Sequence, residues 1–377
     1  MEHFDLVVVG SGPAGEKGAE QAARFGKHVA LIERADHLGG AGINTGTVPS
    51  KTLRETALYF SGLQQRGLYG IDYSLKDELS VREFMHREHI VVSNERQLIS
   101  QNIDQRHIVR VHGVARLDDP HTVRVAAVGG ERLLGSEIIL IATGSAPFHP
   151  PEIPFDDKLI FDSDTILQMK RIPRSMAVLG GGVIGVEYAS IFTALGVDVT
   201  LIEAHARILQ FVDTEIIYRL IHRLETIGLK FILNDHLTTI DAKDGLVNLT
   251  LQNGGRLKFN SVLIAAGRQS NIQGLGLEGV GVELGERGLI LINEQYQTSV
   301  PNIYAAEDVV GFPVLAATSM EQARMAIRHA FDPGISRAPF ACPATGCLCH
   351  SGDVDGRFDR GRMQVRKYPL SDWAGVL

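Results

Sequence analysis

Residues 4–34 read FDLVVVGSGPAGEKGAEQAARFGKHVALIER and contain the pattern that decides the fold. Leu6–Val9 form a continuous apolar run, which is typical of a strand buried on both faces of a parallel sheet. Gly10, Gly12 and Gly15 follow at the spacing G-x-G-x-x-G. The first glycine permits a tight turn, the second lets the backbone approach a pyrophosphate, and the third lets a helix lie close to the strand. The pattern predicts a strand, a phosphate-binding turn and a helix.

The segment after this turn completes a βαβ unit. A helix is predicted from about Pro13 to Phe25. Its N-terminus points at the phosphates, where free N–H groups and the helix dipole favour negative charge. A second strand is predicted at 28–32 and ends at Glu33, which is 18 residues past Gly15. An acid at about this place is expected to accept hydrogen bonds from a ribose of the dinucleotide.

Residues 175–207 repeat the pattern as SMAVLGGGVIGVEYASIFTALGVDVTLIEAHAR. The glycines are Gly180, Gly182 and Gly185, and the acid is Glu203. One G-x-G-x-x-G is weak evidence, and the alternative interpretation is a pair of chance glycine-rich turns. Each copy, however, lies between a hydrophobic strand and a helix and ends in a strand plus an acid. We therefore expect two dinucleotide sites.

The choice between NAD and NADP at the second site stays open. Glu203 alone favours NAD, because a carboxylate repels a 2′-phosphate. Arg207 lies four residues further on and is either a partner for such a phosphate or an ordinary solvated charge. A site with both groups would accept NADH and NADPH in turn.

Three later segments end in small-residue turns or acids. Residues 138–140 are a predicted strand that runs into Ile-Ala-Thr-Gly-Ser at 141–145. Residues 263–265 run into Ala-Gly-Arg at 266–268 in the same way, so each turn would close a nucleotide-binding unit. Residues 302–311 read NIYAAEDVVG, where Asp308 suits a hydrogen bond to a ribitol hydroxyl.

The order of these segments resembles the class I pyridine nucleotide–disulfide oxidoreductase family, and the likeness covers residues 4 to about 331. In the disulfide reductases of that family, the segment equivalent to 39–51, GGAGINTGTVPSK here, carries two cysteines five positions apart. Gly42 and Thr47 stand at those two positions. Thr47 and the stretch LAATSMEQ at 315–322 resemble members that transfer hydride between nicotinamides.

The resemblance implies an α/β fold with two doubly wound, Rossmann-like nucleotide-binding domains, bound FAD, and NAD(P)(H) as substrate. It implies that Lys51 stands near flavin N5, pairs with Glu187 and stabilises the anionic reduced flavin, which makes these two the candidate catalytic residues. The implied FAD site consists of Gly10, Gly12, Pro13, Ala14, Gly15, Glu33, Arg34, Gly40, Thr47, Lys51, Thr143, Gly144 and Asp308. The implied NAD(P) site consists of Gly180, Gly182, Val183, Ile184, Gly185, Glu203, Arg207 and Gly267.

The implied activity is hydride transfer between NADPH and NAD+ through a flavin. Because neither Gly42 nor Thr47 can form a disulfide, dithiol chemistry is not expected. Two alternatives stay open. One is an NAD(P)H oxidase or diaphorase that passes electrons to oxygen or a quinone. The other is an inactive, truncated family member that binds nucleotide without turnover.

The chain departs from the family at two further places. The family has glycine before the ribitol-binding aspartate, whereas Glu307 precedes Asp308 here. A second carboxylate beside the flavin phosphates adds bulk and like-charge repulsion, so it is expected to weaken FAD binding. The family also continues for ~120 residues as an interface domain of ordinary size. That domain forms a homodimer, and it is expected to be absent or truncated in this chain, so dimerisation stays open.

The segment 332–377 has no clear helix or strand period. It holds the three cysteines, Cys342, Cys347 and Cys349, and the single tryptophan. The abrupt change suggests a frameshift or a mispredicted end of the gene. The alternative is a metal module made by these cysteines and His350, but their spacing matches no familiar zinc knuckle, so no metal is expected.

The remaining features set the domains and the compartment. We expect a flavin domain formed by 1–147 and 271–331, with the NAD(P) domain, 148–270, inserted between them. The net charge of −7 argues against nucleic acid or an anionic membrane as partner. No apolar run approaches the roughly 20 residues that span a bilayer. Only residues 1–3 precede the first strand, which leaves no room for a signal peptide, so the cytoplasm is the expected location.

Overall fold

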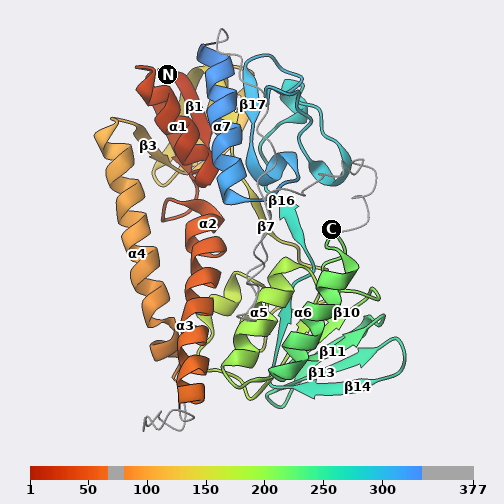
Figure 1. The fold of residues 1–377 in the computed structure, drawn as a ribbon. Helices are drawn as coiled ribbons and strands as arrows, with labels where there is room; N and C mark the ends of the chain where they lie inside the picture. The colour runs from red at the N-terminus through yellow and green to blue at the C-terminus, as the bar shows by residue number, and fades with distance from the viewer. Residues whose placement is uncertain (67–79, 333–377) are drawn as a thin grey trace. The chain divides into compact units, whose positions relative to one another are not determined.

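The computed structural model describes residues 1–66 and 80–332, and these form two compact units (Figure 1). The first unit comprises 1–49, 90–146 and 269–332. The second unit comprises 50–66, 80–89 and 147–268. The segment 332–377 lies outside the described residues except for Asp332, and the expectations for its cysteines and for an interface domain lie outside them too.

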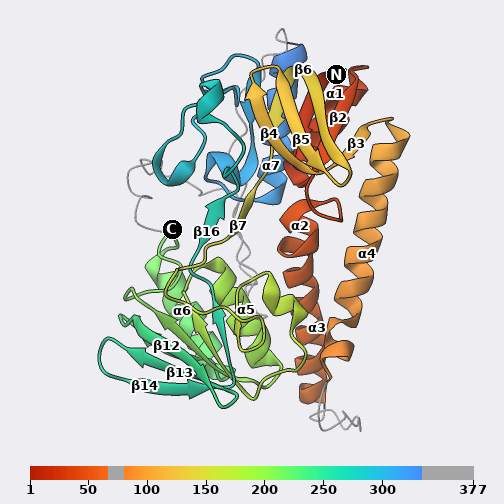
Figure 2. The same cartoon turned by 180° about the vertical axis from the view of Figure 1, so that it is seen from behind.

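The first unit is built on a seven-stranded sheet. Its parallel part has the order β3-β2-β1-β6, and β17 pairs parallel with β6. The strands β4, β5 and β6 form an antiparallel meander, seen most clearly in Figure 2. The bounds are β1 Glu2–Val9, β2 Val29–Glu33, β3 Val109–His112, β4 Val114–Asp119, β5 Thr122–Ala127, β6 Gly130–Ile141 and β17 Ile303–Ala305.

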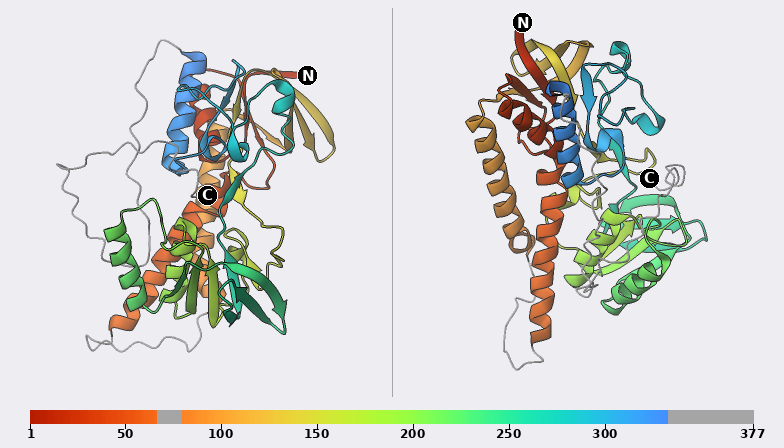
Figure 3. Two further views of the ribbon diagram at one scale, coloured as in Figure 1. Left: turned by 90° about the vertical axis from the view of Figure 1, so that its right-hand side faces the viewer. Right: turned by 45° about the horizontal axis from the view of Figure 1, so that its top comes forward.

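Small residues let the helices of the first unit pack closely on this sheet. The helices α1 and α7 lie side by side (Figures 1 and 3). A Cβ on Gly18 of α1 would lie only 2.5 Å from Leu140 Cδ2 of β6 and 3.5 Å from Ala323 Cβ of α7. The bounds are α1 Pro13–Arg24, α2 Gly40–Asn44, α7 Ala316–Phe331, and the short 3₁₀ helices η3 Glu278–Val280, η4 Glu286–Gly288 and η5 Glu307–Val310. The helix α4, Val81–Gln105, has residues in both units.

The second unit has a five-stranded parallel sheet in the order β11-β10-β9-β15-β8. A separate antiparallel sheet has the order β12-β13-β14. The short strands β7 and β16 pair with each other, and each has residues in both units. Their bounds are β7 Ser145–Pro147, β8 Ile160–Phe161, β9 Ser175–Leu179, β10 Asp198–Glu203, β11 Lys230–Leu233, β12 Leu237–Lys243, β13 Leu246–Leu251, β14 Arg256–Phe259, β15 Ser261–Ile264 and β16 Arg268–Ser270. The helices are α3 Thr47–Arg66, η2 Thr165–Gln168, α5 Val183–Ala194 and α6 Thr214–Thr226.

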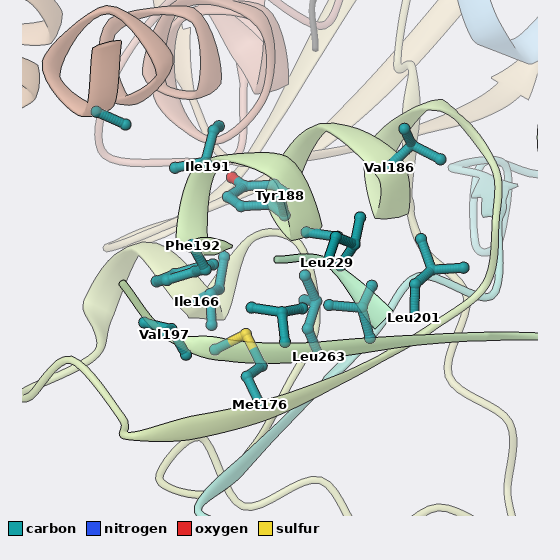
Figure 4. Packing of buried hydrophobic residues seen from close by; sticks show 14 of the residues in the cluster. Ile166, Met176, Val186, Tyr188, Ile191, Phe192, Val197, Leu201, Leu229 and Leu263 are labelled. Atoms are coloured by element: carbon teal, nitrogen blue, oxygen red, sulfur yellow. The ribbon is translucent and has the colours of Figure 1, made fainter. Parts of the chain in front are cut away.

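The apolar core of the second unit includes side chains from α3 and α4, which come earlier in the chain. Figure 4 shows α5 lying across the strands that carry Met176, Leu201 and Leu263. Leu53 of α3 and Phe84 of α4 are fully buried in the same apolar cluster. Residues 50–66 and 80–89 therefore group with the second unit. The expected domain bounds stay a prediction.

The predicted α/β fold class is confirmed. Leu6, Val7 and Val8 are fully buried in β1, as their apolar run predicts. The helix predicted to extend to Phe25 ends one residue earlier. In the segment 302–311 the strand ends at Ala305, so Asp308 lies in the 3₁₀ helix η5 after the strand. No helix within the described ranges is long and apolar enough to cross a membrane.

Asp162 fixes the turn that follows β8. Its Oδ1 accepts hydrogen bonds from the backbone N–H groups of Asp164 at 2.8 Å and Thr165 at 2.7 Å, and its Oδ2 lies 2.6 Å from His149 Nε2. Burial raises the pKa of Asp162, but the Thr165 N–H, the His149 ring and the Asp164 N–H outweigh it, so the pKa lies below its ordinary value. A carboxyl whose pKa is lowered on folding stabilises the fold above its unfolded pKa and loses this effect as pH falls through the folded pKa.

Asp162→Asn is expected to lower the free energy of unfolding by about 2 kcal/mol at pH 7, because the charge-assisted bonds become weaker. Urea denaturation at pH 7 measures this loss, and the difference between the two proteins is expected to shrink below pH 4 as Asp162 is protonated. Asp157→Asn is the matched control, since Asp157 is exposed on the same segment. Equal unfolding midpoints for Asp162→Asn and Asp157→Asn would contradict the assignment.

Candidate active site

The first glycine-rich turn has backbone geometry that requires glycine. Gly10 has φ +102°, and a Cβ there would lie 2.0 Å from the Ala142 carbonyl oxygen. A Cβ on Gly15 would lie 1.9 Å from the Gly10 carbonyl oxygen. Gly12 is the extended N-cap of α1, whose first N–H groups have no partner within the helix. We call this turn with the start of α1 the first cradle; its geometry suits a bound phosphate.

Glu33 at the end of β2 is held by the same turn. Its Oε2 accepts hydrogen bonds from the Ser11 N–H at 3.0 Å and the Ser11 hydroxyl at 2.6 Å, and its Oε1 accepts one from the Ala35 N–H at 2.9 Å. The Ser11 hydroxyl in turn accepts the Gly39 N–H at 3.1 Å. Sequence reasoning missed Ser11; the available signal was a hydroxyl residue inside the G-x-G turn.

The second glycine-rich turn has the same construction. Gly180 has φ +111°, and a Cβ there would lie 2.3 Å from the Ala265 carbonyl oxygen. A Cβ on Gly185 would lie 1.9 Å from the Gly180 carbonyl oxygen. Gly182 is the extended N-cap of α5. We call this turn with the start of α5 the second cradle. It repeats the first cradle, including the close approach of its third glycine to its first.

In the second cradle, Glu203 is the counterpart of Glu33. Its Oε2 accepts the Gly181 N–H at 2.5 Å, and its Oε1 accepts the His205 N–H at 2.8 Å. In addition, the His205 ring Nδ1 lies 2.5 Å from Glu203 Oε1. Sequence reasoning missed His205, which stands between the acid and Arg207. The Arg207 guanidinium contacts the hydroxyl of Thr214.

The turn after β6 adds polar groups to the first unit. Gly144 has φ +65°, and the Ser145 hydroxyl donates to Asp308 Oδ2 at 2.5 Å. The Asn271 side chain donates to the Thr143 carbonyl oxygen at 2.9 Å. Among the residues that the structure describes, the buried Thr143 Oγ1 is one of a few side-chain atoms without a hydrogen-bond partner. A buried hydroxyl of this kind is suited to meet a ligand.

The second unit brings together the two candidate catalytic residues. Lys51 Nζ lies 3.1 Å from Glu187 Oε1, with 36% of the Lys51 side chain and 8% of the Glu187 side chain exposed. Lys51 is near the start of α3, and Glu187 lies in the second turn of α5. Next to Glu187, burial raises the pKa of the Tyr188 phenol, and Asp164 and Glu187 add to this effect. The ion pair implied by the resemblance is present; its catalytic role stays a prediction.

The segment 39–51 has no thiol, and two glycines near its start, Gly40 and Gly42, let residues 40–42 lie against the first cradle. A Cβ on Gly40 would lie 2.7 Å from Gly12 Cα, and one on Gly42 would lie 2.9 Å from Pro13 Cγ. The described ranges contain no cysteine, and they contain no cluster of three or more His, Cys, Asp or Glu side chains that could hold a metal ion.

Glu307 is the residue that breaks the pattern of the first cradle. It has φ +69°, is 6% exposed, and its N–H donates to Gln322 Oε1 at 2.8 Å. A Cβ on Gly12 would lie 3.3 Å from Glu307 Oε2, and one on Gly144 would lie 3.2 Å from Oε1. The carboxyl group of Glu307 therefore lies between the glycine-rich turn and the turn after β6.

The other predicted site residues flank the two cradles. Arg34 follows β2, Pro13 and Ala14 begin α1, Thr47 begins α3, Val183 and Ile184 begin α5, and Gly267, with φ +100°, follows β15. Thus the residues predicted for FAD, apart from Lys51, lie in the first unit, and those predicted for NAD(P) lie in the second. Their roles in binding stay predictions.

Comparison with known proteins shows the family to which this chain belongs. A model of the pyridine nucleotide-disulphide oxidoreductase family matches residues 4–330. The chain belongs to this family. Among its curated members, soluble pyridine nucleotide transhydrogenase of Mycobacterium bovis is 41% identical over 333 residues, or 88% of this chain and 71% of the relative. The protein of the same name from Chromohalobacter salexigens is 38% identical over 328 residues, or 86% of this chain and 70% of the relative.

Two solved structures have the same fold. The HOCl-induced flavoprotein disulfide reductase RclA from Escherichia coli superimposes with a TM-score of 0.78 and 30% identity, covering 89% of this chain and 73% of that one. LpdA from Mycobacterium tuberculosis gives a TM-score of 0.83 and 25% identity, covering 90% of this chain and 74% of that one. The family and fold predicted from the sequence are confirmed.

Proposed function

We propose that this protein is an FAD-dependent oxidoreductase that transfers hydride between NADPH and NAD+. The observation that carries the proposal is a pair of cradles of one construction in a chain with Gly42 and Thr47 where the disulfide reductases carry a dithiol. Two dinucleotide sites without a thiol relay suit direct exchange between a flavin and nicotinamides. The relatives named soluble pyridine nucleotide transhydrogenase support this activity.

The first cradle is the proposed FAD site. The N–H groups at the start of α1 would bind the diphosphate, Glu33 would accept hydrogen bonds from the adenosine ribose, and Asp308 would accept them from the ribitol. The unpartnered Thr143 hydroxyl also fits a polar ligand there. When bound, FAD supplies the ability to accept hydride from one nicotinamide and return it to another. Lys51, oriented by Glu187, would stabilise the negative charge that develops on this group.

The second cradle is the proposed nicotinamide nucleotide site. Gly182 and the first N–H groups of α5 would bind the pyrophosphate, and Glu203 would orient the ribose. Glu203 already accepts two backbone N–H groups and contacts the His205 ring. Arg207 follows on the same loop and, at the edge of this site, is the proposed contact for a 2′-phosphate.

Arg207→Ala is expected to raise the KM for NADPH about tenfold and to leave the KM for NADH within twofold, because the loss of one charged phosphate contact costs about 1–2 kcal/mol. Steady-state kinetics with each nucleotide measure the two constants. Arg219→Ala is the control, since Arg219 is an exposed cation on α6 that pairs with Glu215. A parallel rise for both nucleotides would show that Arg207 only supports the loop.

The proposal is tested by incubating the purified, flavin-loaded protein with NADPH and thio-NAD+ and following reduced thio-NAD+ by absorbance. Transfer without oxygen uptake supports a transhydrogenase. Oxygen uptake with NADH alone, at the rate of NADH loss, would instead support the oxidase or diaphorase alternative. Bound nucleotide with neither reaction would support the inactive alternative.

We also propose that 1–147 and 271–331 form the flavin domain and that 148–270 form the NAD(P) domain, which the position of one cradle in each unit supports. The cytoplasm is the proposed location, and the relatives named soluble pyridine nucleotide transhydrogenase support it.

Nicotinamide dinucleotides are the proposed partners. Whether the chain also forms the homodimer implied by the resemblance is answered by light scattering after gel filtration.

A further inference from the structure

The Glu307 carboxyl group occupies the first cradle in the manner of a bound anion. The Ala14 backbone N–H, in the first turn of α1, acts on this carboxyl group and lowers its pKa. Its two oxygens lie beside Gly12 on one side and Gly144 on the other. The free N–H groups at a helix N-terminus are the groups that bind phosphate in dinucleotide sites. The Glu307 carboxyl group therefore lies beside the groups that would bind such a phosphate.

This position is energetically unfavourable for a glutamate, because of both its backbone conformation and its burial. The residue has left-handed backbone conformation at φ +69°, which disfavours side chains other than glycine and asparagine. Burial raises the pKa of Glu307 well above its ordinary value, repulsion from Asp308 and Glu33 raises it further, and only the Ala14 N–H opposes this. From α7, the neighbouring group is the neutral Gln322 amide, which accepts the Glu307 backbone N–H. Among the described residues, the two charged side chains that act on Glu307, Asp308 and Glu33, are thus both acidic.

We propose that Glu307 is an internal competitor for the flavin diphosphate site, which must either leave the cradle or take up a proton before FAD binds. The proposal rests on the assignment of the first cradle to FAD. A diphosphate brings negative charge to the N–H groups beside the Glu307 carboxyl group, and two anions there repel each other strongly. Protonation of Glu307 removes this repulsion without displacing the side chain, so FAD affinity is expected to increase as the pH falls.

The experiment is a titration of the flavin-depleted full chain with FAD at pH 6 and pH 8, followed by quenching of flavin fluorescence. Wild-type protein is expected to bind FAD about tenfold more tightly at pH 6 than at pH 8. Glu307→Gln keeps the size of the side chain and its backbone conformation but removes the charge. It is expected to bind FAD about tenfold more tightly than wild type at pH 8 and with little pH dependence.

Two further variants test the space that the side chain takes and control for the loss of any acidic residue. Glu307→Gly also opens the space and relieves the backbone strain, so it should bind FAD at least as tightly as Glu307→Gln. Glu294→Gln is the control, because Glu294 is an exposed acid in the same unit. Without FAD, Glu307→Gln is expected to raise Tm at pH 8 by about 3 °C, since a buried charge is removed.

The outcomes separate this proposal from the proposed function. If wild type and Glu307→Gln bind FAD with equal affinity and equal pH dependence, the proposal is overturned and the flavin assignment stands. If Glu307→Gln and Glu307→Gly bind more weakly, Glu307 is a binding group for the cofactor and the proposal is also overturned. If no variant binds FAD although all of them are folded, both the proposal and the flavin assignment fail.

Discussion

Replacing Lys51 with alanine is expected to lower kcat for hydride transfer from NADPH to thio-NAD+ about 100-fold, the effect of removing one charge-stabilising group from an active site. Lys51 is a cation held 3.1 Å from the buried Glu187 carboxylate, so its position is fixed. The value of kcat is calculated per bound flavin, read from the visible spectrum, because Lys51 also belongs to the proposed FAD site and its loss can lower the flavin content.

The variant must be distinguished from one that is merely less stable. Removing Lys51 leaves Glu187 mostly buried without this cation, which lowers stability. The double variant Lys51→Ala/Glu187→Gln removes both charges and is expected to recover stability but not kcat. Lys51→Arg keeps the charge and should recover much of kcat. Lys230→Ala, which loses an exposed pair with Asp198, is the control. A kcat for Lys51→Ala within twofold of wild type would refute the catalytic role.

Gly185→Ala is expected to lower the free energy of unfolding by about 3 kcal/mol, the upper range for forcing an atom into a packed interior. The added Cβ would lie 1.9 Å from the Gly180 carbonyl oxygen, and backbone atoms can yield only if α5 moves away from the turn. Urea denaturation of the flavin-loaded protein measures the loss, with fluorescence reporting each transition.

Gly182→Ala is the matched variant three residues earlier. An added Cβ there meets no atom of the described residues within 4 Å, and its backbone conformation is allowed for alanine. Stability is therefore expected to change by less than about 0.5 kcal/mol. The affinity for NADPH is nevertheless expected to fall about tenfold, because the second glycine is the place where backbone approaches the pyrophosphate. Unchanged affinity in isothermal titration, or equal loss of stability in the two variants, would contradict the assignment of this turn.

The two cradles could be predicted from the sequence because their requirements are local. The contacts at Gly10, Gly15, Gly180 and Gly185 leave no space for a Cβ, so only one residue type satisfies the backbone at each position. The buried strands that lead into the turns need continuous apolar runs, which are readable in one dimension. The distance from the turn to Glu33 is set by one helix and one strand of ordinary length.

The parts that sequence reasoning missed depend on contacts between distant segments. Nothing local shows that Leu53 and Phe84 are buried in the cluster beneath α5, which places 50–66 and 80–89 in the second unit. The sequence raised the conflict at Glu307 but could not show that its carboxyl group would lie between Gly12 and Gly144. The bonds of Ser11 and His205 to the two acids were missed, because each depends on the exact path of a loop.

The contact between α1 and α7 has a consequence for synthesis on the ribosome. Gly18 of α1 packs near Ala323 of α7, although 304 residues separate them in the chain. The segments of the second unit that the structure describes, by contrast, have all been translated once residue 268 has been added. We therefore expect these segments to fold first, while the apolar surface of β1 and α1 stays uncovered until α7 has been made. During that interval the nascent first unit is the part most dependent on chaperones.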